Sequence, residues 1–177
     1  MVKLTLVKTP NPALLSSTKP VKQIDQKTKQ IVREMMRILN ACQNPIGVGL
    51  AAPQVGLNLQ IFLIKPTAQA KIRCFINPKI INSSAKQNQN KKTLEGCLSV
   101  HNVWANIQRA KWVELEYLSL QNKQKREKFT GWEAQIVLHE MDHLNGVLFT
   151  HRALEQNKQL YRIIRKKGKE RLEPLEL

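Results

Sequence analysis

The sequence has few cysteines and no long apolar run, and each shortage excludes a class of protein. Three cysteines, Cys42, Cys74 and Cys97, are an odd number without paired spacing, so we expect no disulfide framework and a reducing compartment. No apolar stretch approaches the roughly 18 residues that a membrane-spanning helix needs. The first six residues are too few and too polar for a signal peptide, so we expect no membrane span and no secretion signal.

Acidic residues are also scarce, which leaves a large positive charge. Lys and Arg number 29 against 13 Asp and Glu, so the formal net charge is +16 over 177 residues. A field of this sign attracts polyanions such as nucleic acid, a ribonucleoprotein surface or anionic lipid. The alternative is a uniformly lysine-rich surface without such a partner, and composition alone does not separate the two.

The remaining composition is that of one ordinary globular domain, because hydrophobic residues make up 42% of the chain and charged residues 24%. Apolar residues at steps of three and four predict a helix from about Asp25 to Asn40, with Asp25 as its N-cap. The polar stretch 83–92 is predicted to be a mobile surface loop, and nothing divides residues 1–177 into two domains. Strands are predicted at 60–65, 72–76, 79–81 and 112–120.

A second helix is predicted to begin after residue 130. Thr130-Gly131-Trp132-Glu133 fits a capping box, in which Thr130 and Glu133 satisfy free backbone N–H groups reciprocally. The residues that follow are apolar around nearly the whole circumference, a pattern typical of a buried helix. Asn145-Gly146 supplies the stop signal at its end.

This buried helix contains the motif His139-Glu140-Met141-Asp142-His143. Residues four apart lie on one helical face, so both imidazoles can bind one metal ion with Glu140 beside them. Polar side chains in an apolar helix cost several kcal/mol when they lack partners, so these residues need a purpose. The alternative, two core histidines bonded to backbone carbonyls, is less consistent with the full motif.

A catalytic metal of this type needs a third protein ligand and an open position for water. The metzincin spacing puts Phe149 at the third ligand position, and His151 falls two residues late. The gluzincin pattern would use Glu155 or Glu170, and neither has supporting context. Cys97 remains, and a thiolate beside two imidazoles suits Fe(II), Zn(II), Ni(II) or Co(II).

A third feature is the run Gly47-Val48-Gly49-Leu50-Ala51-Ala52-Pro53-Gln54. Its small residues allow close backbone approach, but it lacks the third glycine of a dinucleotide-binding fingerprint. Residues 47–54, Glu95-Gly96-Cys97-Leu98-Ser99 and 139–143, in this order and at these separations, resemble the peptide deformylases. The resemblance extends from near Pro10 to about Leu154, and it is strongest to the bacterial and organellar class with a helical C-terminus.

The resemblance implies a fold, a reaction and a cofactor. The fold is α+β, with mostly antiparallel β-sheets packed around a central metal-binding helix and with a C-terminal helix. The reaction is the hydrolytic removal of the formyl group from formylmethionine at the start of nascent polypeptides. The cofactor is one divalent metal ion, with Fe(II) expected as the native ion and Zn(II), Ni(II) or Co(II) as alternatives.

The resemblance also implies the role of each site residue. Glu140 would take a proton from the water at the fourth metal position and later deliver it to the leaving amine. Gln54 and the backbone N–H of Leu98 would form the oxyanion hole. The implied metal ligands are Cys97, His139 and His143.

The substrate site follows from the same resemblance. Gly49 would pair with the peptide backbone in strand fashion, and Val48 and Ile136 would line an apolar pocket for the methionine side chain. The residues expected to bind substrate are Val48, Gly49, Glu95, Gly96 and Ile136.

Two positions depart from the family pattern and leave the preference for residues after methionine open. His101 stands where proline is common, and Trp104 stands where many members carry an arginine. We expect His101 to be a surface or hydrogen-bonded histidine rather than a metal ligand. Arg109 matches a family arginine and is expected to pair with Glu95.

The C-terminal segment holds much of the positive charge. Eight Lys and Arg residues between Arg152 and Arg171 face two acidic residues, and residues 160, 163 and 164 form an apolar stripe. We therefore expect residues 152–171 to be a basic amphipathic helix. The resemblance implies that this helix contacts ribosomal RNA near the exit tunnel. The alternative is a helix docked on its own domain with a solvated outer face.

Two rival functions stay open at this point. One is a metalloendopeptidase with the H-E-x-x-H motif, in which Cys97 would not be needed. The other is a catalytically inactive, ribosome-binding relative, which would need neither Glu140 nor Gln54. The expected location is the bacterial cytoplasm, or an organellar matrix or stroma in a eukaryote.

Overall fold

The computed structural model describes residues 3–43, 45–87, 94–166 and 169–176. In this part of the chain it contains the α+β arrangement that was predicted, with helices packed against antiparallel sheets. The helices are α1 (Gln26–Ala41), α2 (Gly131–Leu144) and α3 (Phe149–Glu155), with short 3-10 helices η1 (Pro12–Leu15) and η2 (Ala52–Val55). The strands are β1 (Gly49–Ala51), β2 (Ile61–Ile64), β3 (Arg73–Ser83), β4 (Glu95–Cys97), β5 (Val100–Ala105), β6 (Trp112–Leu118), β7 (Gln124–Thr130), β8 (Leu160–Lys166) and β9 (Lys169–Pro174).

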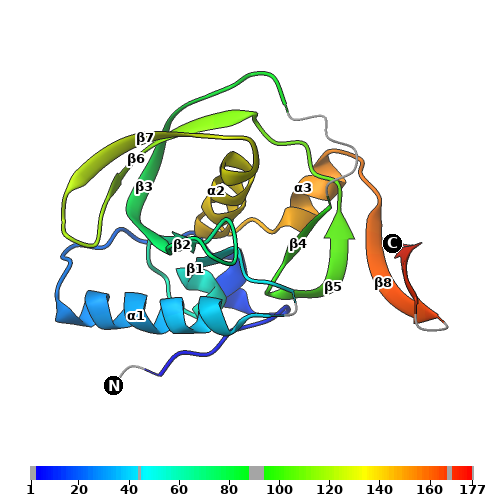
Figure 1. Ribbon diagram of the computed structural model, residues 1–177, viewed down its shortest axis with the longest axis horizontal. Coiled ribbons are helices and arrows are strands. Elements are labelled where there is room, and N and C mark those ends of the chain that lie inside the picture. The colour runs from blue at the N-terminus through cyan, green and yellow to red at the C-terminus, as the bar shows by residue number, and fades with distance from the viewer. Residues whose placement is uncertain (1–2, 44, 88–93, 167–168, 177) are drawn as a thin grey trace.

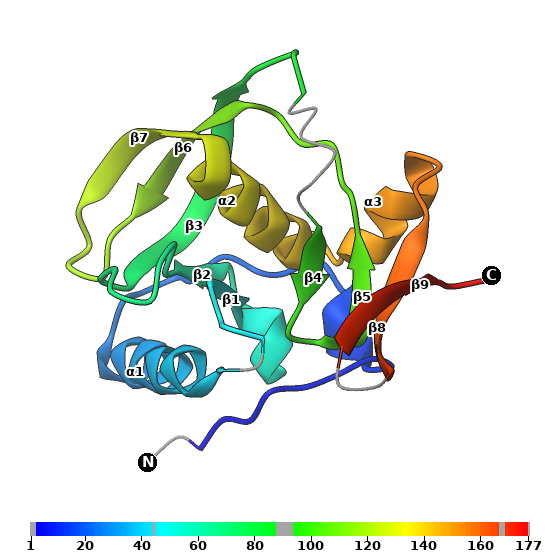
Figure 2. The same cartoon turned by 45° about the vertical axis from the view of Figure 1, so that its right-hand side comes forward.

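The strands form two sheets, and α2 lies in the middle of the molecule beside both of them (Figure 1). The first sheet has the strand order β1-β2-β3-β6-β7, and the second has the order β4-β5-β8-β9. Neighbouring strands in both sheets are antiparallel. Figure 2 shows the second sheet together with α3 on the side of α2 opposite to β3, β6 and β7.

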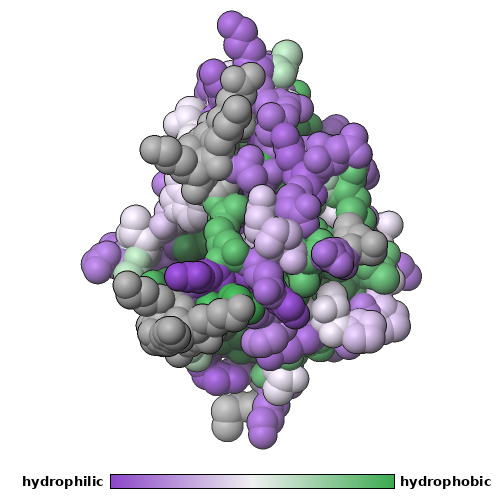
Figure 3. All heavy atoms as spheres, turned by 90° about the vertical axis from the view of Figure 1, so that its right-hand side faces the viewer, coloured by the Kyte–Doolittle hydropathy of each residue, from purple (hydrophilic) through white to green (hydrophobic). Residues whose placement is uncertain are grey.

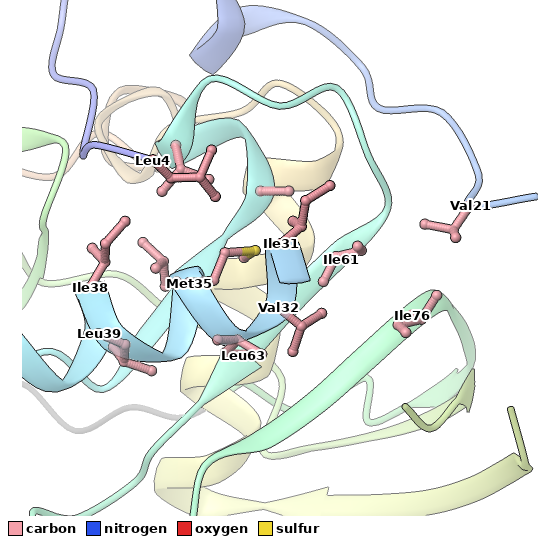
Figure 4. Packing of buried hydrophobic residues seen from close by; sticks show 13 residues of the cluster. Leu4, Val21, Ile31, Val32, Met35, Ile38, Leu39, Ile61, Leu63 and Ile76 are labelled. Carbon is pink, nitrogen blue, oxygen red and sulfur yellow. The ribbon is translucent and has the colours of Figure 1, made fainter. Parts of the chain in front are cut away.

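Helix α1 forms where its apolar periodicity predicted it. The Asp25 carboxylate accepts a hydrogen bond from the backbone N–H of Thr28 at 2.7 Å and caps the helix start. The inner face of α1 packs on β2 and β3 (Figure 4), and a fully buried aliphatic side chain stabilises a fold by about 1.5–3 kcal/mol. This cluster includes Ile31, Val32, Met35, Ile38, Leu39, Ile61, Leu63 and Ile76.

Helix α2 is buried around most of its circumference, as predicted. It ends at Leu144 with Asn145 as its C-cap, and Gly146 follows with φ +71°, a conformation that L side chains rarely adopt. A Cβ at Gly146 would also lie 2.6 Å from the backbone oxygen of Leu15, so the chain crosses closely there. The predicted stop of the helix is therefore confirmed.

The predicted capping box at the start of α2 is wrong. Thr130 is the N-cap residue, but its side chain makes no capping hydrogen bond. The carboxylate of Glu133 instead lies 3.6 Å from the guanidinium of Arg73 on β3. The capping motif is present in the sequence, but Glu133 pairs with Arg73 of the first sheet instead of completing the box.

An aromatic cluster fills the space between α2 and the first sheet. The rings of Phe62 and Phe75 stack with centroids 4.6 Å apart, and Tyr117 and Phe129 pack on Phe75 at 4.5 Å and 5.7 Å. Aromatic pairs at these distances add about 0.5–1.5 kcal/mol beyond the burial of their area. The cluster gives α2 a rigid support, since Ile136 and neighbouring helix residues pack on it.

The first sheet agrees with the predicted strands except in three places, the first being the short strand β1, which was not among them. The strand β3 continues through Asn77-Pro78, because Asn77 adopts φ +49° and a register shift between Ile76 and Lys79 absorbs the irregularity. The sequence analysis did not predict β7, whose side chains are mostly charged and exposed. It is an edge strand, and charged side chains are typical of exposed edges.

The C-terminal helix predicted over 152–171 is wrong beyond residue 155. Helix α3 ends at Glu155, and the antiparallel pair β8 and β9 follows. Strand β8 pairs with β5, so that Tyr161 lies opposite Trp104 and Leu160 opposite Ala105. The free edge of β5 supplies backbone partners for β8, and the segment extends the second sheet (Figure 2).

The predicted loop over 83–92 lies partly outside the described residues, which omit 88–93. Ser83 belongs to β3, and Gln87 forms an isolated bridge with Ala110. Among the described residues, the helices are too short or too polar to cross a membrane.

Candidate metal centre

The three predicted metal ligands lie together in the structure. Cys97 ends β4, whereas His139 and His143 lie one turn apart on the same face of α2. The Cys97 Sγ is 3.1 Å from His143 Nε2, and one ligand atom from each residue lies within 4.8 Å of the others. All three side chains are buried, which holds the donors in place without competition from bulk water.

This donor set fits a divalent metal ion. One thiolate and two imidazoles are borderline-soft ligands that suit first-row transition metals. Three protein ligands on one side leave a position for water or substrate, as in catalytic rather than structural sites. Within the described residues, no other group of His, Cys, Asp and Glu side chains has this geometry. His101 is exposed, and the earlier candidates Glu155 and His151 lie outside the group.

Glu95 on β4 orients His139. The carboxylate Oε1 lies 2.6 Å from His139 Nδ1, so Nδ1–H donates to it and Nε2 is left for the metal. Burial by itself lowers the pKa of His139, but the charge of Glu95 and hydrogen bonds outweigh it and raise that pKa well above its usual value. Positive charge on the ring is thus favoured, and a cation at Nε2 can take the place of the proton.

The second histidine has the opposite tendency. Burial lowers the pKa of His143 well below its usual value, and the charge of His139 lowers it further. His143 is therefore held as the neutral imidazole, which is the form that binds a metal ion.

Arg109 anchors Glu95. Its guanidinium donates to both carboxylate oxygens, at 2.6 Å and 2.8 Å, which confirms the predicted pair. Burial alone would raise the pKa of Glu95, but the adjacent charge and hydrogen bonds of Arg109 lower it overall. Bidentate pairing fixes the carboxylate in one plane. Both oxygens of Glu95 thus have partners, and one of these contacts orients His139.

Glu140 is a buried carboxyl group beside the ligands. Its Oε2 has no hydrogen-bond partner among the described residues. Burial raises the pKa of Glu140 to about 7, which is the range of a group that can both accept and return a proton. A Cβ at Gly49 of β1 would collide with Glu140 Oε1. The glycine therefore makes room for the carboxylate at the edge of the site.

Gln54 on η2 presents its amide to the same place. The side-chain Oε1 accepts a hydrogen bond from the backbone N–H of Ala51 at 2.8 Å, which fixes the amide orientation. The Nε2 group then lies 3.4 Å from Cys97 Sγ and 3.3 Å from Ser99 Oγ. Its N–H donors are thus held next to a metal ligand.

A cavity of about 320 Å³ opens beside the ligands, and most of its wall is apolar. All the residues expected to bind substrate line it, together with Gln54, Leu98 and Glu140. The sequence analysis left open the role of Trp104, whose ring lies so close to Gly96 that a Cβ there would be 2.7 Å from it. Trp132 also lines the cavity, and its indole N–H donates to the backbone oxygen of Pro66 at 3.0 Å.

The sequence analysis missed one set of contacts around the ligands. Asp142, inside the motif, receives hydrogen bonds from Arg109 and from Arg152 of α3 at 2.9 Å and 2.7 Å. Its position could have been a signal, because it is a second carboxylate within the part of the helix that is apolar on most faces. The partner Arg152 had been counted with the basic C-terminal segment and gave no signal of its own.

Comparison with known proteins agrees with this geometry. Residues 3–159 match the family described as polypeptide deformylase. The chain is 35% identical over 164 residues to the peptide deformylase of Pseudothermotoga lettingae, covering 90% of this chain and 91% of that one. It is 37% identical over 161 residues to the enzyme of Borreliella burgdorferi, covering 90% and 94%.

Solved structures give the same result. The peptide deformylase of Synechococcus elongatus in complex with actinonin is 36% identical with a TM-score of 0.76, covering 84% of this chain and 79% of that one. The Thermotoga maritima enzyme is 30% identical with a TM-score of 0.77, covering 86% and 98%. With the family match over most of its length, and with the Cys/His/His site in place, this chain belongs to the polypeptide deformylase family.

Proposed function

We propose how this chain carries out the reaction of its family, the removal of the formyl group from formylmethionine at the start of nascent polypeptides. Water adds to the formyl carbon, the C–N bond breaks, and formate and a free amine are the products. The observation that carries the proposal is the buried group Cys97, His139 and His143 with Glu140 beside it. A divalent ion held by these ligands supplies Lewis acidity and lowers the pKa of water.

Glu140 moves the proton in this scheme. Its buried carboxylate accepts a proton from the attacking water and later donates it to the nitrogen that leaves. A pKa raised to about 7 by burial suits both directions of transfer. The free Oε2 and the space provided by Gly49 support this role.

Gln54 and Leu98 stabilise the negative charge that develops on the formyl oxygen. The hydrogen bond from Ala51 fixes the orientation of the Gln54 amide. One Nε2–H would exchange its contact with Cys97 Sγ or Ser99 Oγ for the formyl oxygen. The backbone N–H of Leu98, next to the ligand Cys97, is the second donor that we propose. Both residues line the cavity beside the ligands.

The cavity holds the substrate methionine. Val48 and Ile136 on its wall match the apolar thioether side chain, and the short strand β1 offers Gly49 for strand-like pairing with the peptide backbone. Gly96, which also lines the cavity, lies in close contact with the Trp104 ring. The H-E-x-x-H endopeptidase and the inactive relative are not favoured, because the chain has the deformylase ligand set and both Glu140 and Gln54.

The donor set suits several first-row ions, and we propose Fe(II) as the native one. A ligand set of one thiolate and two imidazoles also accepts Zn(II), Ni(II) and Co(II). Metal analysis of enzyme purified without oxygen tests this choice, and a zinc content that accounts for all the activity would contradict it.

Substitution of Glu140 tests the catalytic proposal. Glu140→Gln keeps the shape of the side chain but removes the proton acceptor, so we expect bound metal at the parent level and kcat on a formyl-Met tripeptide lower by about 10²-fold or more. Cys97→Ala is the matched variant and should lose the metal. Loss of metal from Glu140→Gln would make this residue a ligand, and retention by Cys97→Ala would remove that cysteine from the site.

We also propose that the basic C-terminal segment contacts ribosomal RNA, and that the enzyme works where ribosomes translate, in the bacterial cytoplasm or an organellar matrix or stroma. The formal charge of +16 supports attraction to RNA. The second sheet and its C-terminal strands lie on a side of the molecule that is mostly hydrophilic (Figure 3).

Because the metal ligands come from the second sheet and from α2, we infer that residues 1–177 form one catalytic domain.

Neutralising this segment tests the ribosome contact. Arg162, Arg165, Lys166 and Lys169 are changed to Gln, and we expect weaker co-sedimentation with ribosomes across a salt series but unchanged hydrolysis of a free tripeptide. The control removes the same charge elsewhere, at exposed Lys27, Lys111, Lys123 and Lys125. An equal loss of binding in both variants would mean that only net charge matters.

A further inference from the structure

The motif on α2 contains one acidic residue that the proposed reaction does not use. Asp142 is buried, stands next to the ligand His143, and faces two guanidinium groups. Its Oδ2 accepts from Arg109 at 2.9 Å, and its Oδ1 accepts from Arg152 at 2.7 Å. A buried carboxylate with two charged partners is expensive to form and depends on both of them.

Arg109 connects this carboxylate to the metal ligand. The same guanidinium binds Glu95 in a bidentate manner, and Glu95 holds the Nδ1 of His139 at 2.6 Å. From His139 outward, charges of opposite sign alternate without a gap: Glu95, Arg109, Asp142 and Arg152.

Arg152 is the outer end of this series. It lies on α3, with its side chain 36% exposed, and its remaining contact is with Glu155, 3.0 Å away and 60% exposed. Helix α3 is held in place by Phe149 and Ala153, which are buried in the core cluster that also contains Cys97. The position of Arg152 is therefore set by packing against the same part of the molecule as the metal site.

Arg152 balances the charge of the buried Asp142 carboxylate. Without Arg152, among the described residues, Arg109 alone would balance Asp142 while also binding Glu95, the carboxylate that His139 contacts. Arg152 neutralises Asp142 from the outer side, so Arg109 can keep two of its N–H donors on Glu95 in the geometry that orients His139. A displaced Glu95 would alter the direction and basicity of the His139 ring.

We propose that Arg152 and Asp142 are positioning residues for the metal centre, which act on His139 through Arg109 and Glu95. This inference rests on the metal site of the proposed function. It gives Arg152 a role at the metal centre, whereas the charge pattern of the sequence had grouped this residue with the basic C-terminal segment.

Metal release from three variants tests the proposal. Arg152→Met removes the charge and keeps much of the side-chain volume. We expect Co(II) or Zn(II) to be released about 3- to 10-fold faster than from the parent, less than the 10- to 100-fold typical of direct outer partners. The Co(II) absorption bands should also shift. Arg152→Lys should restore the bands and most of the release rate. Glu155→Gln, which breaks only the exposed contact of Arg152, is the matched control and should behave as the parent.

A double variant separates positioning from mere attachment of α3. If Arg152 acts by balancing Asp142, then Asp142→Asn combined with Arg152→Met should release metal more slowly than Arg152→Met alone, since the unbalanced charge is gone. If Arg152→Met lowers the melting temperature but leaves the release rate and Co(II) bands unchanged, the residue only tethers α3 and the proposal is wrong.

Two further outcomes bear on the proposal. Should Arg152→Met fail to fold, Arg152→Gln is measured instead, and an unchanged release rate there overturns the proposal equally. If the parent itself holds no metal, or Cys97→Ala holds it as tightly, the metal assignment fails rather than the role of Arg152.

Discussion

Two segments were both predicted to be helices, because each carries apolar residues at helical spacing: the segment that forms α2 and the C-terminal segment that forms β8 and β9. Only α2 is a helix. Its residues are apolar on nearly every side, and the first sheet and η2 pack around it. In the C-terminal segment, Leu160 is buried, while Ile163 and Ile164 are only half-buried.

The difference lies in what each segment can contact. An all-round apolar helix can be buried only at the centre of a domain, so its pattern has one solution. A short stripe of three aliphatic residues among cations fits a helix and a strand equally well. The free edge of β5 decides between them, since it offers backbone partners opposite Trp104 and Ala105. The family match also ends at residue 159, directly before β8.

The largest effect is expected where α2 meets β1. In Gly49→Ala, the new methyl group would collide with the Glu140 carboxylate. We expect kcat/KM for a formyl-Met peptide to fall by about 10²-fold while bound metal is unchanged. Gly131→Ala is the control at the start of α2, where nothing lies within 4 Å of a new Cβ. Its φ of +56° should cost about 1 kcal/mol of stability without loss of activity. If Gly49→Ala keeps the kcat/KM of the parent, the Glu140 carboxylate can move aside without loss of function and the prediction is wrong.

An intermediate effect distinguishes strand from helix in the C-terminal segment. In a helix, residues 160 and 163 share a face and should contribute equally to stability. In β8 they point to opposite sides, and Leu160 is the more buried. Leu160→Ala should therefore lower the free energy of unfolding by about 2 kcal/mol, and Ile163→Ala should lower it clearly less. Urea unfolding of both variants measures this, and equal losses would favour the helix.

The smallest effect is expected at the N-cap of α2, whose contribution to stability is compared with that of the N-cap of α1. The Thr130 side chain makes no capping bond, so Thr130→Ala should change the free energy of unfolding by less than about 0.5 kcal/mol. A working N-cap is typically worth about 1 kcal/mol. Asp25→Ala removes the cap of α1 and should lower the melting temperature measurably. A larger drop for Thr130→Ala than for Asp25→Ala would restore the predicted capping box.

Local patterns predicted the parts of the fold that do not depend on distant partners. Helix α1 forms where the apolar steps and Asp25 indicated, and β6 forms inside the strand predicted over 112–120. The charged strand β7 was missed because an exposed edge needs little apolar content, so its sequence resembles a loop. The continuity of β3 through Asn77-Pro78 was missed because the register shift there depends on its neighbour β6.

The sequence by itself predicted a metal site, because the H-E-x-x-H spacing places two ligands on one helical face. Its three motifs together carried the resemblance that implied the family, the fold class and the third ligand. Tertiary structure decided three further things. Glu133 pairs with Arg73 instead of capping its helix, the C-terminal segment pairs with β5, and Arg152 turns inward to Asp142. In each case a charged or backbone group had several possible partners, and only the packing of distant segments brought one of them within reach.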